Sequence, residues 1–288
     1  MRSRGRGIVE LRRWLVDRFV TIAAAATVLL VLAPLAAIFG YLLYRGMSAL
    51  NLEFLAHTPK PVGEAGGGMA NAIIGSGLIL ATASAIAVPV GIGAGIYVAE
   101  YGRGWLRTLI RFTADVLSGL PSIVAGIAVY SLMVVKQGHF SAVAGGVALA
   151  ILMVPTSARA TEEVLLMVPT SVREAALALG VAQWRTTLSI TLRTATAGVI
   201  TGVMLAFARA AGETAPLLFT AFGNQFWNLN LNQPTAALPL QIFTYAISPF
   251  DEWHRQAWTG ALVLILLIVG TVAVVRAIAA RGVVRGTT

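Results

Sequence analysis

Long apolar runs constrain the fold of this chain more than any other feature of its sequence. Six of them hold few or no charged residues, and they cover about residues 20–44, 71–98, 112–135, 140–158, 194–219 and 257–280. A helix needs roughly 20 apolar residues to cross the hydrocarbon layer of a bilayer. Because only helices and closed barrels satisfy their backbone hydrogen bonds in that layer, the runs predict an all-α, polytopic membrane protein with six transmembrane helices.

The first run follows a basic tail and at first resembles a secretory signal. Six arginines precede it within residues 1–18. The apolar part covers residues 20–44, which is longer than the roughly 7–15 residues of a cleavable signal. We therefore predict a retained membrane span. The chain is expected to comprise a cytoplasmic basic tail at 1–19, a six-span domain at 20–280 and a cytoplasmic tail at 281–288.

The positions of the basic residues predict the orientation in the membrane. Of the 21 lysines and arginines, 16 fall in the tails and in the loops that share their side of the membrane. The opposite loops hold only Arg45, Lys60, Lys136 and Arg255. Basic residues concentrate on the cytoplasmic side of membrane proteins, so both termini are predicted to be cytoplasmic. Orientation also explains the net charge of +9, and no nucleic-acid partner is expected.

Several function classes lack the residues that they need. Cysteine is absent, and His57, His139 and His254 lie in different predicted loops, which argues against thiol chemistry, a metal cluster and a catalytic triad. The only lysines, Lys60 and Lys136, lie in outer loops, and no G-x-x-x-x-G-K-[ST] phosphate loop occurs. We therefore expect no catalytic residue, metal or cofactor in this chain. If ATP drives the protein, a separate chain hydrolyses it.

A polar segment at 159–193 interrupts the apolar runs and must lie in water beside the membrane. Within it, Ser171 and Glu174 have the spacing of a capping box, in which each side chain caps a free backbone N–H of the first helical turn. Gly180 follows an alanine- and leucine-rich run and suits the left-handed residue that closes a helix. The segment predicts a compact surface helix at about 172–179.

Part of this segment resembles a known signature. Glu174-Ala175-Ala176, Gly180 and Ile190 are similar to the E-A-A loop of ABC-importer permeases of the MetI-like fold, with Arg193 where the family has proline. The resemblance implies that residues 159–193 form a coupling loop whose helix docks into a cleft of a cytoplasmic ATPase. It makes Arg173, Glu174, Ala175, Ala176 and Gly180 the ATPase-coupling residues. The alternative is a well-capped amphipathic linker helix.

The third apolar run contains a helix breaker. Ser118-Gly119-Leu120-Pro121-Ser122 places proline and glycine inside the run. Backbone groups freed by such a break must be satisfied by neighbours or by a water-lined cavity. Broken helices in transporters often lie beside the substrate path, and the N-terminus of the second half attracts anions. The alternative is an ordinary proline kink.

Arg209 and Glu213 are the most informative charges inside the runs. Arg209 lies about 22 Å along the fifth run at roughly 1.5 Å per residue, and the spacing of four predicts one shared helix face. Ionisable residues at such depth mark function by default, and the arginine fork matches a tetrahedral oxyanion. We expect a substrate pathway lined by Arg209, Glu213, Thr214, Pro121 and Ser122. The alternative is a buried ion pair between helices.

Three segments narrow the resemblance to one branch of this family. Residues 119–126 and 208–216 are similar to the phosphate-specific branch of these permeases, and residues 249–254 resemble one of its two permease subunits. The resemblance implies a multi-pass permease of the bacterial cytoplasmic membrane, surrounded by lipid, that moves inorganic phosphate. Its implied partners are a homologous second permease, a cytoplasmic ATPase dimer that binds ATP and Mg²⁺, and an extracytoplasmic phosphate-binding protein.

Other features predict packing. Glycines at 91, 93 and 95, and the pair Gly198 and Gly202, allow close approach between helices in a membrane. In the outer loop at 220–256, the apolar stretch 238–247 begins near Pro239 and predicts a short interfacial helix. An interfacial anchor is the simpler role for it, and gating or contact with an outer partner is the alternative.

Rival functions remain open from the sequence alone. The nearest is an importer of the same architecture for another oxyanion, such as sulfate, molybdate or phosphonate, since arginine recognises any of them. A stand-alone secondary transporter would need several intramembrane acids and an inverted repeat, and neither is clear here. A membrane scaffold would leave Arg209 and Glu213 without a role, and an enzyme lacks a nucleophile–base or metal constellation.

Overall fold

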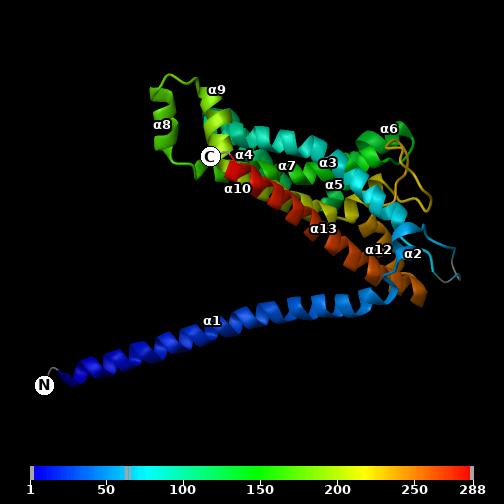
Figure 1. The fold of residues 1–288 in the computed structure, drawn as a ribbon, viewed down its shortest axis with the longest axis horizontal. Coiled ribbons are helices and arrows are strands. Elements are labelled where there is room, and N and C mark those ends of the chain that lie inside the picture. The colour runs from blue at the N-terminus through cyan, green and yellow to red at the C-terminus, as the bar shows by residue number, and fades with distance from the viewer. Residues whose placement is uncertain (1–2, 62–63, 65, 286–288) are drawn as a thin grey trace.

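The computed structural model describes residues 3–61, 64 and 66–285. Within these residues every regular element is helical, and the only β-pairing is an isolated bridge between Phe222 and Thr235. The predicted all-α fold is therefore confirmed. Figure 1 shows a bundle of long helices, with a short helical loop at one end and irregular loops at the other.

The spans follow the apolar runs. Five helical stretches of the described residues are long and apolar enough to cross a membrane: Arg12–Ala49, Ala70–Tyr101, Ala142–Leu166, Gln183–Ala211 and Asp251–Ala279. A sixth is formed by two helices, Gly104–Gly119 and Ser122–Gln137, when this bent pair is counted as one span. Six spans agree with the prediction, but one of them is broken.

The principal helices have these bounds: α1 Ser3–Gly46, α2 Leu52–Ala56, α3 Ala70–Ile96, α4 Gly104–Gly119, α5 Ser122–Val129, α6 Val135–Gln137 and α7 Ala142–Leu166. They continue with α8 Thr170–Ala178, α9 Gln183–Thr186, α10 Leu192–Ala211, α11 Ala215–Thr220, α12 Leu238–Ala246 and α13 Asp251–Arg285. Four short helical elements extend them: η1 Met47–Ala49, η2 Tyr97–Tyr101, η3 Tyr130–Val134 and η4 Thr187–Thr191, the last three of which are π-helical.

Helix α1 leaves the bundle and projects away from it (Figure 1). Its side chains are exposed from Arg12 to Tyr41, and it packs only near its C-terminal end, where Leu42 and Gly46 are buried. There the Thr259 hydroxyl donates to the Gly46 carbonyl at 2.8 Å. Most of this apolar helix therefore has no protein neighbour within the chain.

The centre of the bundle is the contact of α3 with α7. A Cβ placed on Gly91 would lie 2.6 Å from the Ser157 Cβ, and one on Gly95 would lie 2.6 Å from the Ala158 carbonyl oxygen. The two helices therefore approach each other more closely than any larger residue would permit. The packing role predicted for Gly91 and Gly95 is confirmed, whereas that for Gly93 is wrong, because a Cβ there would meet nothing within 4 Å.

Gly95→Ala is expected to destabilise the bundle, because the new methyl group meets the backbone of α7, which cannot move aside. Overpacking of this kind costs about 1–3 kcal/mol, seen as a lower midpoint of thermal unfolding in detergent. Gly93→Ala is the matched control, since a Cβ there meets nothing within 4 Å. Equal midpoints for the two variants would contradict the close packing of α3 on α7.

The fourth span is longer than predicted. Helix α7 continues to Leu166, whereas the sequence predicted that the span ends at residue 158. The extension of α7 carries Arg159 and Glu162, and both form ion pairs with residues of α4. Arg159 pairs with Asp115. Glu162 pairs with Arg111, whose Nε lies 2.7 Å from the Glu162 Oε1. The polar segment therefore begins as helix, because charge pairs on a neighbouring helix support it.

The surface helix within the polar segment 159–193 was predicted correctly at its end and incorrectly at its start. Helix α8 begins at Thr170, its N-cap is Pro169, and no side chain caps it, so the predicted capping box of Ser171 and Glu174 is wrong. Ser171 already lies inside the first turn. At the other end Gly180 has a φ of +80°, as predicted, and its N–H donates to the Leu177 carbonyl at 2.9 Å.

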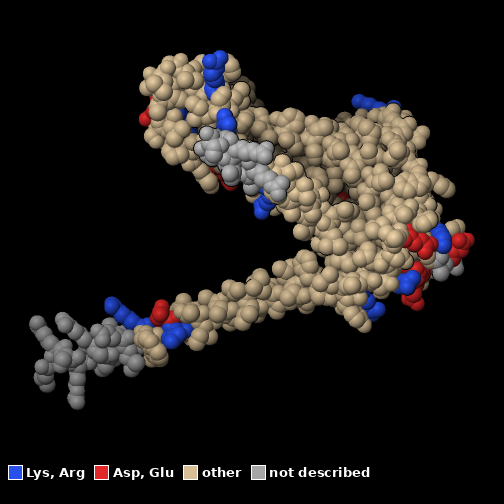
Figure 2. Space-filling view, viewed as in Figure 1, with Lys and Arg blue, Asp and Glu red and all other residues tan. Residues whose placement is uncertain are grey.

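The opposite end of the bundle is closed by the loops around α2 and α12. Helix α12 confirms the predicted short helix near Pro239. In the first loop, the Glu53 carboxylate accepts the Gly67 N–H at 3.1 Å and lies 3.2 Å from Lys60. These two partners lower the pKa of Glu53 from its usual value. Figure 2 shows charges gathered at this end, while the sides of the spans are almost free of them on the visible face.

Candidate functional site

The third span is broken where the sequence predicted it. Helix α4 ends at Gly119, Leu120 and Pro121 are extended with ψ angles of 128° and 132°, and α5 begins at Ser122. The two halves of the span differ in direction by 103°. An ordinary proline kink bends a helix far less than this, so the chain makes a true break here.

A second break occurs in the fifth run, which the sequence predicted to be one span from 194 to 219. Helix α10 ends at Ala211, and α11 begins at Ala215 with Pro216 in its first turn. Proline cannot continue a helix, because it lacks an N–H and clashes with the preceding turn. Arg209 therefore lies in the last turn of α10, and Glu213 lies in the break. The prediction that both lie on one helix face is wrong.

The two breaks lie together. A Cβ on Gly126 of α5 would be 2.6 Å from the Cα of Pro216 of α11, so these short helices are in close contact. Between the breaks is an open pocket of about 270 Å³. It is lined by the 117–122 segment, by Leu152 of α7, and by Arg209 and Glu213.

Four of the five predicted pathway residues line this pocket: Arg209, Glu213, Pro121 and Ser122. The fifth does not, because the Thr214 hydroxyl points to the Pro239 carbonyl of α12 at 3.5 Å. Leu152 was not predicted. It lies within an apolar run, and only the packing of α7 against the breaks brings it to the site.

Arg209 is exposed and Glu213 is half-buried. None of the ion pairs found among the described residues joins them, so the alternative of a buried ion pair between helices is not what the structure contains. The arginine is open toward the pocket. The start of α5 adds the backbone N–H groups of Ser122 and Ile123, which have no acceptor within the helix and favour anions, whereas the Val124 N–H donates to the Pro121 carbonyl at 2.9 Å.

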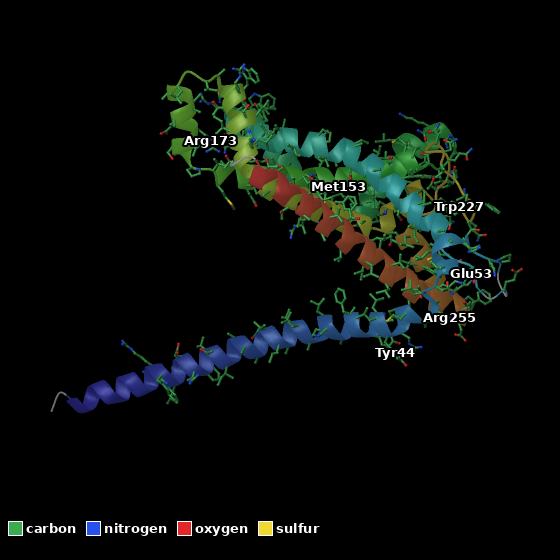
Figure 3. The ribbon with its side chains drawn as sticks, viewed as in Figure 1. Tyr44, Glu53, Met153, Arg173, Trp227 and Arg255 are labelled. Atoms are coloured by element: carbon green, nitrogen blue, oxygen red, sulfur yellow. The ribbon has the colours of Figure 1, made fainter. Side chains whose placement is uncertain are left out.

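The loop that contains Arg173 and α8 lies at the end of the bundle opposite Glu53 and Arg255 (Figure 3). On α8, Glu174 and Ala175 are exposed, and Ala176 is buried. Arg173 does not extend from the surface. Its guanidinium points into the chain, where Nη1 donates to the Val168 carbonyl at 2.7 Å and Nε donates to the Glu100 carboxylate at 2.9 Å.

The exposed surface of the loop is apolar at several points. Leu179 is 84% exposed, Met167 77% and Trp184 57%. This segment is expected to lie in water, where large apolar side chains are unfavourable when exposed. A cluster of them there is typical of a surface that binds another protein. The loop therefore presents a helix with an acidic residue, Glu174, flanked by apolar groups.

The structure thus has two broken helices that face each other inside a bundle of spans, and a compact helix outside the bundle. These are features of a membrane transport subunit. Residues 91–284 match the family described as the binding-protein-dependent transport system inner membrane component, and the chain belongs to that family.

Curated relatives cover most of the chain. It is 46% identical over 253 residues to the phosphate transport system permease protein PstA of Yersinia pestis, with 88% of this chain and 86% of the relative covered. It is 35% identical over 267 residues to PstA of Mycobacterium leprae, with 91% and 88% covered. A solved structure of the MetNI methionine ABC transporter shares the fold, with a TM-score of 0.55, 21% identity, and coverage of 76% of this chain and 97% of that chain.

Proposed function

We propose that this chain is the PstA-type permease subunit of an ATP-driven importer that moves inorganic phosphate across the bacterial cytoplasmic membrane. Family membership and relatives named as phosphate permeases support it. The observation that carries it is the pocket between the two breaks, where Arg209 and Glu213 face the start of α5. A cation and backbone donors suit any oxyanion, and an acceptor beside them suits one that carries a proton, such as hydrogenphosphate.

Each group has a chemical role in this proposal. The Arg209 guanidinium cannot lose its charge and offers two parallel donors to two phosphate oxygens. The first N–H groups of α5 and the Ser122 hydroxyl donate to the remaining oxygens. The Glu213 carboxylate accepts a hydrogen bond from the P–O–H group of hydrogenphosphate. Sulfate has no such proton at neutral pH and leaves the carboxylate facing a second anion without a hydrogen bond.

The proposal requires partners, because this chain contains no nucleotide loop. ATP and Mg²⁺ bind to a PstB-like cytoplasmic ATPase dimer, which docks on α8 around Glu174. A homologous PstC-like permease completes the pathway, and its surface and lipid cover the exposed length of α1. A PstS-like binding protein delivers phosphate to the opposite end. Both termini lie in the cytoplasm, in accord with the distribution of arginines.

Glu213→Gln is expected to lower the preference for phosphate over sulfate. The amide is close in shape to the carboxylate but is neutral, so it no longer repels sulfate. A hydrogen bond to a charged group contributes about 1.5–3 kcal/mol, which corresponds to roughly a tenfold or greater loss of preference. The measurement is ATP-dependent uptake of labelled phosphate and labelled sulfate into vesicles that contain the complete complex.

Thr214→Val is the control, because its hydroxyl faces α12 and not the pocket. It is expected to keep the preference of the wild type. If Glu213→Gln also keeps both the rate and the preference, Glu213 does not select the substrate.

A further inference from the structure

Glu100 is a buried acid for which the proposed function gives no role. It lies at the end of α3, in the π-helical turn η2. Its side chain is 7% exposed, and that of its partner Arg173 is 18% exposed. A carboxylate buried to this extent is costly unless it is paired. The Arg173 Nη2 atom lies 2.8 Å from it.

Arg173 connects three parts of the chain. It belongs to α8, and it donates to the Val168 carbonyl at 2.7 Å and to the Leu165 carbonyl at 2.6 Å. Leu165 lies in the last turn of α7, and Val168 follows two residues after the helix ends; the Leu165 carbonyl also accepts the Val168 N–H at 3.1 Å. With the bond to Glu100, one side chain therefore fixes α8 to the ends of both α7 and α3.

The same turn also contacts the returning limb of the loop. The Gln183 side chain donates to the Glu100 carbonyl at 3.2 Å, and the Tyr101 hydroxyl donates to the Thr187 hydroxyl at 3.3 Å. Thr187 begins η4, a second π-helical turn. Such π-helical turns are frequent at functional sites. Element η2 thus contacts both sides of the coupling loop.

Besides these bonds, α8 contacts mainly α9 and η4 of the same loop. Ala176 is the only buried residue of this helix. By contrast, α3 and α7 pack without a gap along Gly91 and Gly95, and α7 reaches the pocket through Leu152. Close-packed helices move together and transmit displacement. A force on α8 therefore has a direct route to the pocket through its attachment to α3 and α7, beside the route along η4 and α10.

We propose that the Glu100–Arg173 pair is the joint that makes α8 move as one body with α3 and α7, so that displacement of α8 by the ATPase opens and closes the pocket. Arg173 is then a positioning residue within this chain, and Glu100 is its partner. The proposal rests on the coupling role assigned to α8 under the proposed function.

The test uses the complete complex in vesicles and measures two quantities in the same sample: ATP hydrolysis stimulated by the loaded binding protein, and phosphate uptake. In Glu100→Gln the side chain keeps its shape and loses its charge. Loss of a charge-assisted hydrogen bond is expected to lower uptake per ATP hydrolysed about tenfold, while stimulated hydrolysis stays within about twofold of the wild type.

Two further variants complete the design. Arg173→Lys keeps the charge but cannot reach the carboxylate and both carbonyls together, so its uptake per ATP should lie between those of Glu100→Gln and the wild type. Arg103→Gln removes a charge from an exposed side chain near the same turn and should leave the ratio unchanged.

The results distinguish a Glu100–Arg173 pair that transmits motion from a pair that only stabilises the fold or has no effect. If hydrolysis and uptake fall together in Glu100→Gln, the pair merely stabilises the fold, and if neither falls, the pair transmits nothing; either result overturns the proposal. A failure of the proposed function is visible separately, because the wild-type complex would then take up no phosphate.

Discussion

Arg209→Gln is expected to lower ATP-dependent phosphate uptake at least about tenfold while the complex still assembles. Among the described residues that line the pocket, Arg209 is the only cation. Glutamine keeps one donor group and loses both the charge and the parallel fork. A hydrogen bond to a charged group contributes about 1.5–3 kcal/mol, and each 1.36 kcal/mol is about tenfold in rate. Uptake of labelled phosphate into vesicles measures the loss, and gel filtration of the complex measures assembly.

Two other substitutions make this result specific. Arg209→Lys keeps the charge without the fork, so its uptake should lie between that of the wild type and that of Arg209→Gln. Arg276→Gln removes an exposed arginine from α13, away from the pocket, and should transport normally. Full uptake by Arg209→Gln would mean that the arginine serves the structure of the break and not the anion.

Glu174→Lys is expected to prevent the ATPase from docking. Glu174 is exposed on α8, the helix that stands outside the bundle (Figure 1). Reversal of a charge at the centre of an interface typically costs 2 kcal/mol or more, so binding should weaken about thirtyfold or further. The measurement is copurification of the ATPase with the permease, followed by titration of the ATPase onto permease in detergent.

The control for Glu174→Lys is the same charge change at the other end of the molecule. Glu64 is exposed in the loop that contains Glu53, and Glu64→Lys should leave binding of the ATPase unchanged. If Glu174→Lys binds the ATPase as tightly as the wild type, α8 is a linker helix, which is the alternative that the sequence left open.

The sequence predicted those features that depend on local chemistry. The spans were predicted from the length of the apolar runs alone. The left-handed conformation of Gly180 was predicted because the end of α8 requires such a residue. The break at Pro121 follows from a proline inside a hydrophobic run. In each case the residue that decides the structure lies within a few positions of its effect, so no knowledge of the tertiary fold was needed.

The predictions were wrong where residues distant in the sequence determine the local structure. Helix α7 extends beyond residue 158 because α4 supplies partners for Arg159 and Glu162. Helix α8 begins at Thr170 without the predicted cap, and Arg173 points inward because Glu100, 73 residues earlier, is its partner. A one-dimensional pattern contains no such pairing. Glu100 could have been noticed only as an unexplained acid at the end of an apolar run.

Four residues of the pocket were predicted from the sequence, but its geometry was not. Arg209 and Glu213 were expected on one helix face, because the spacing of four within an apolar run favours a continuous helix. Pro216 ends that helix early and places Glu213 in a break. The second break then faces the first, and this pairing of two irregular segments brings backbone donors and side chains to one pocket.

The central claim is that the pathway near Arg209 carries inorganic phosphate. The most direct measurement is uptake of labelled phosphate by the wild-type chain, assembled with its second permease, ATPase and binding protein in vesicles, with unlabelled sulfate in excess. We predict uptake that requires ATP and that excess sulfate does not reduce. Uptake that sulfate suppresses, or that proceeds equally without ATP, would contradict the assignment of this chain to an ATP-driven phosphate importer.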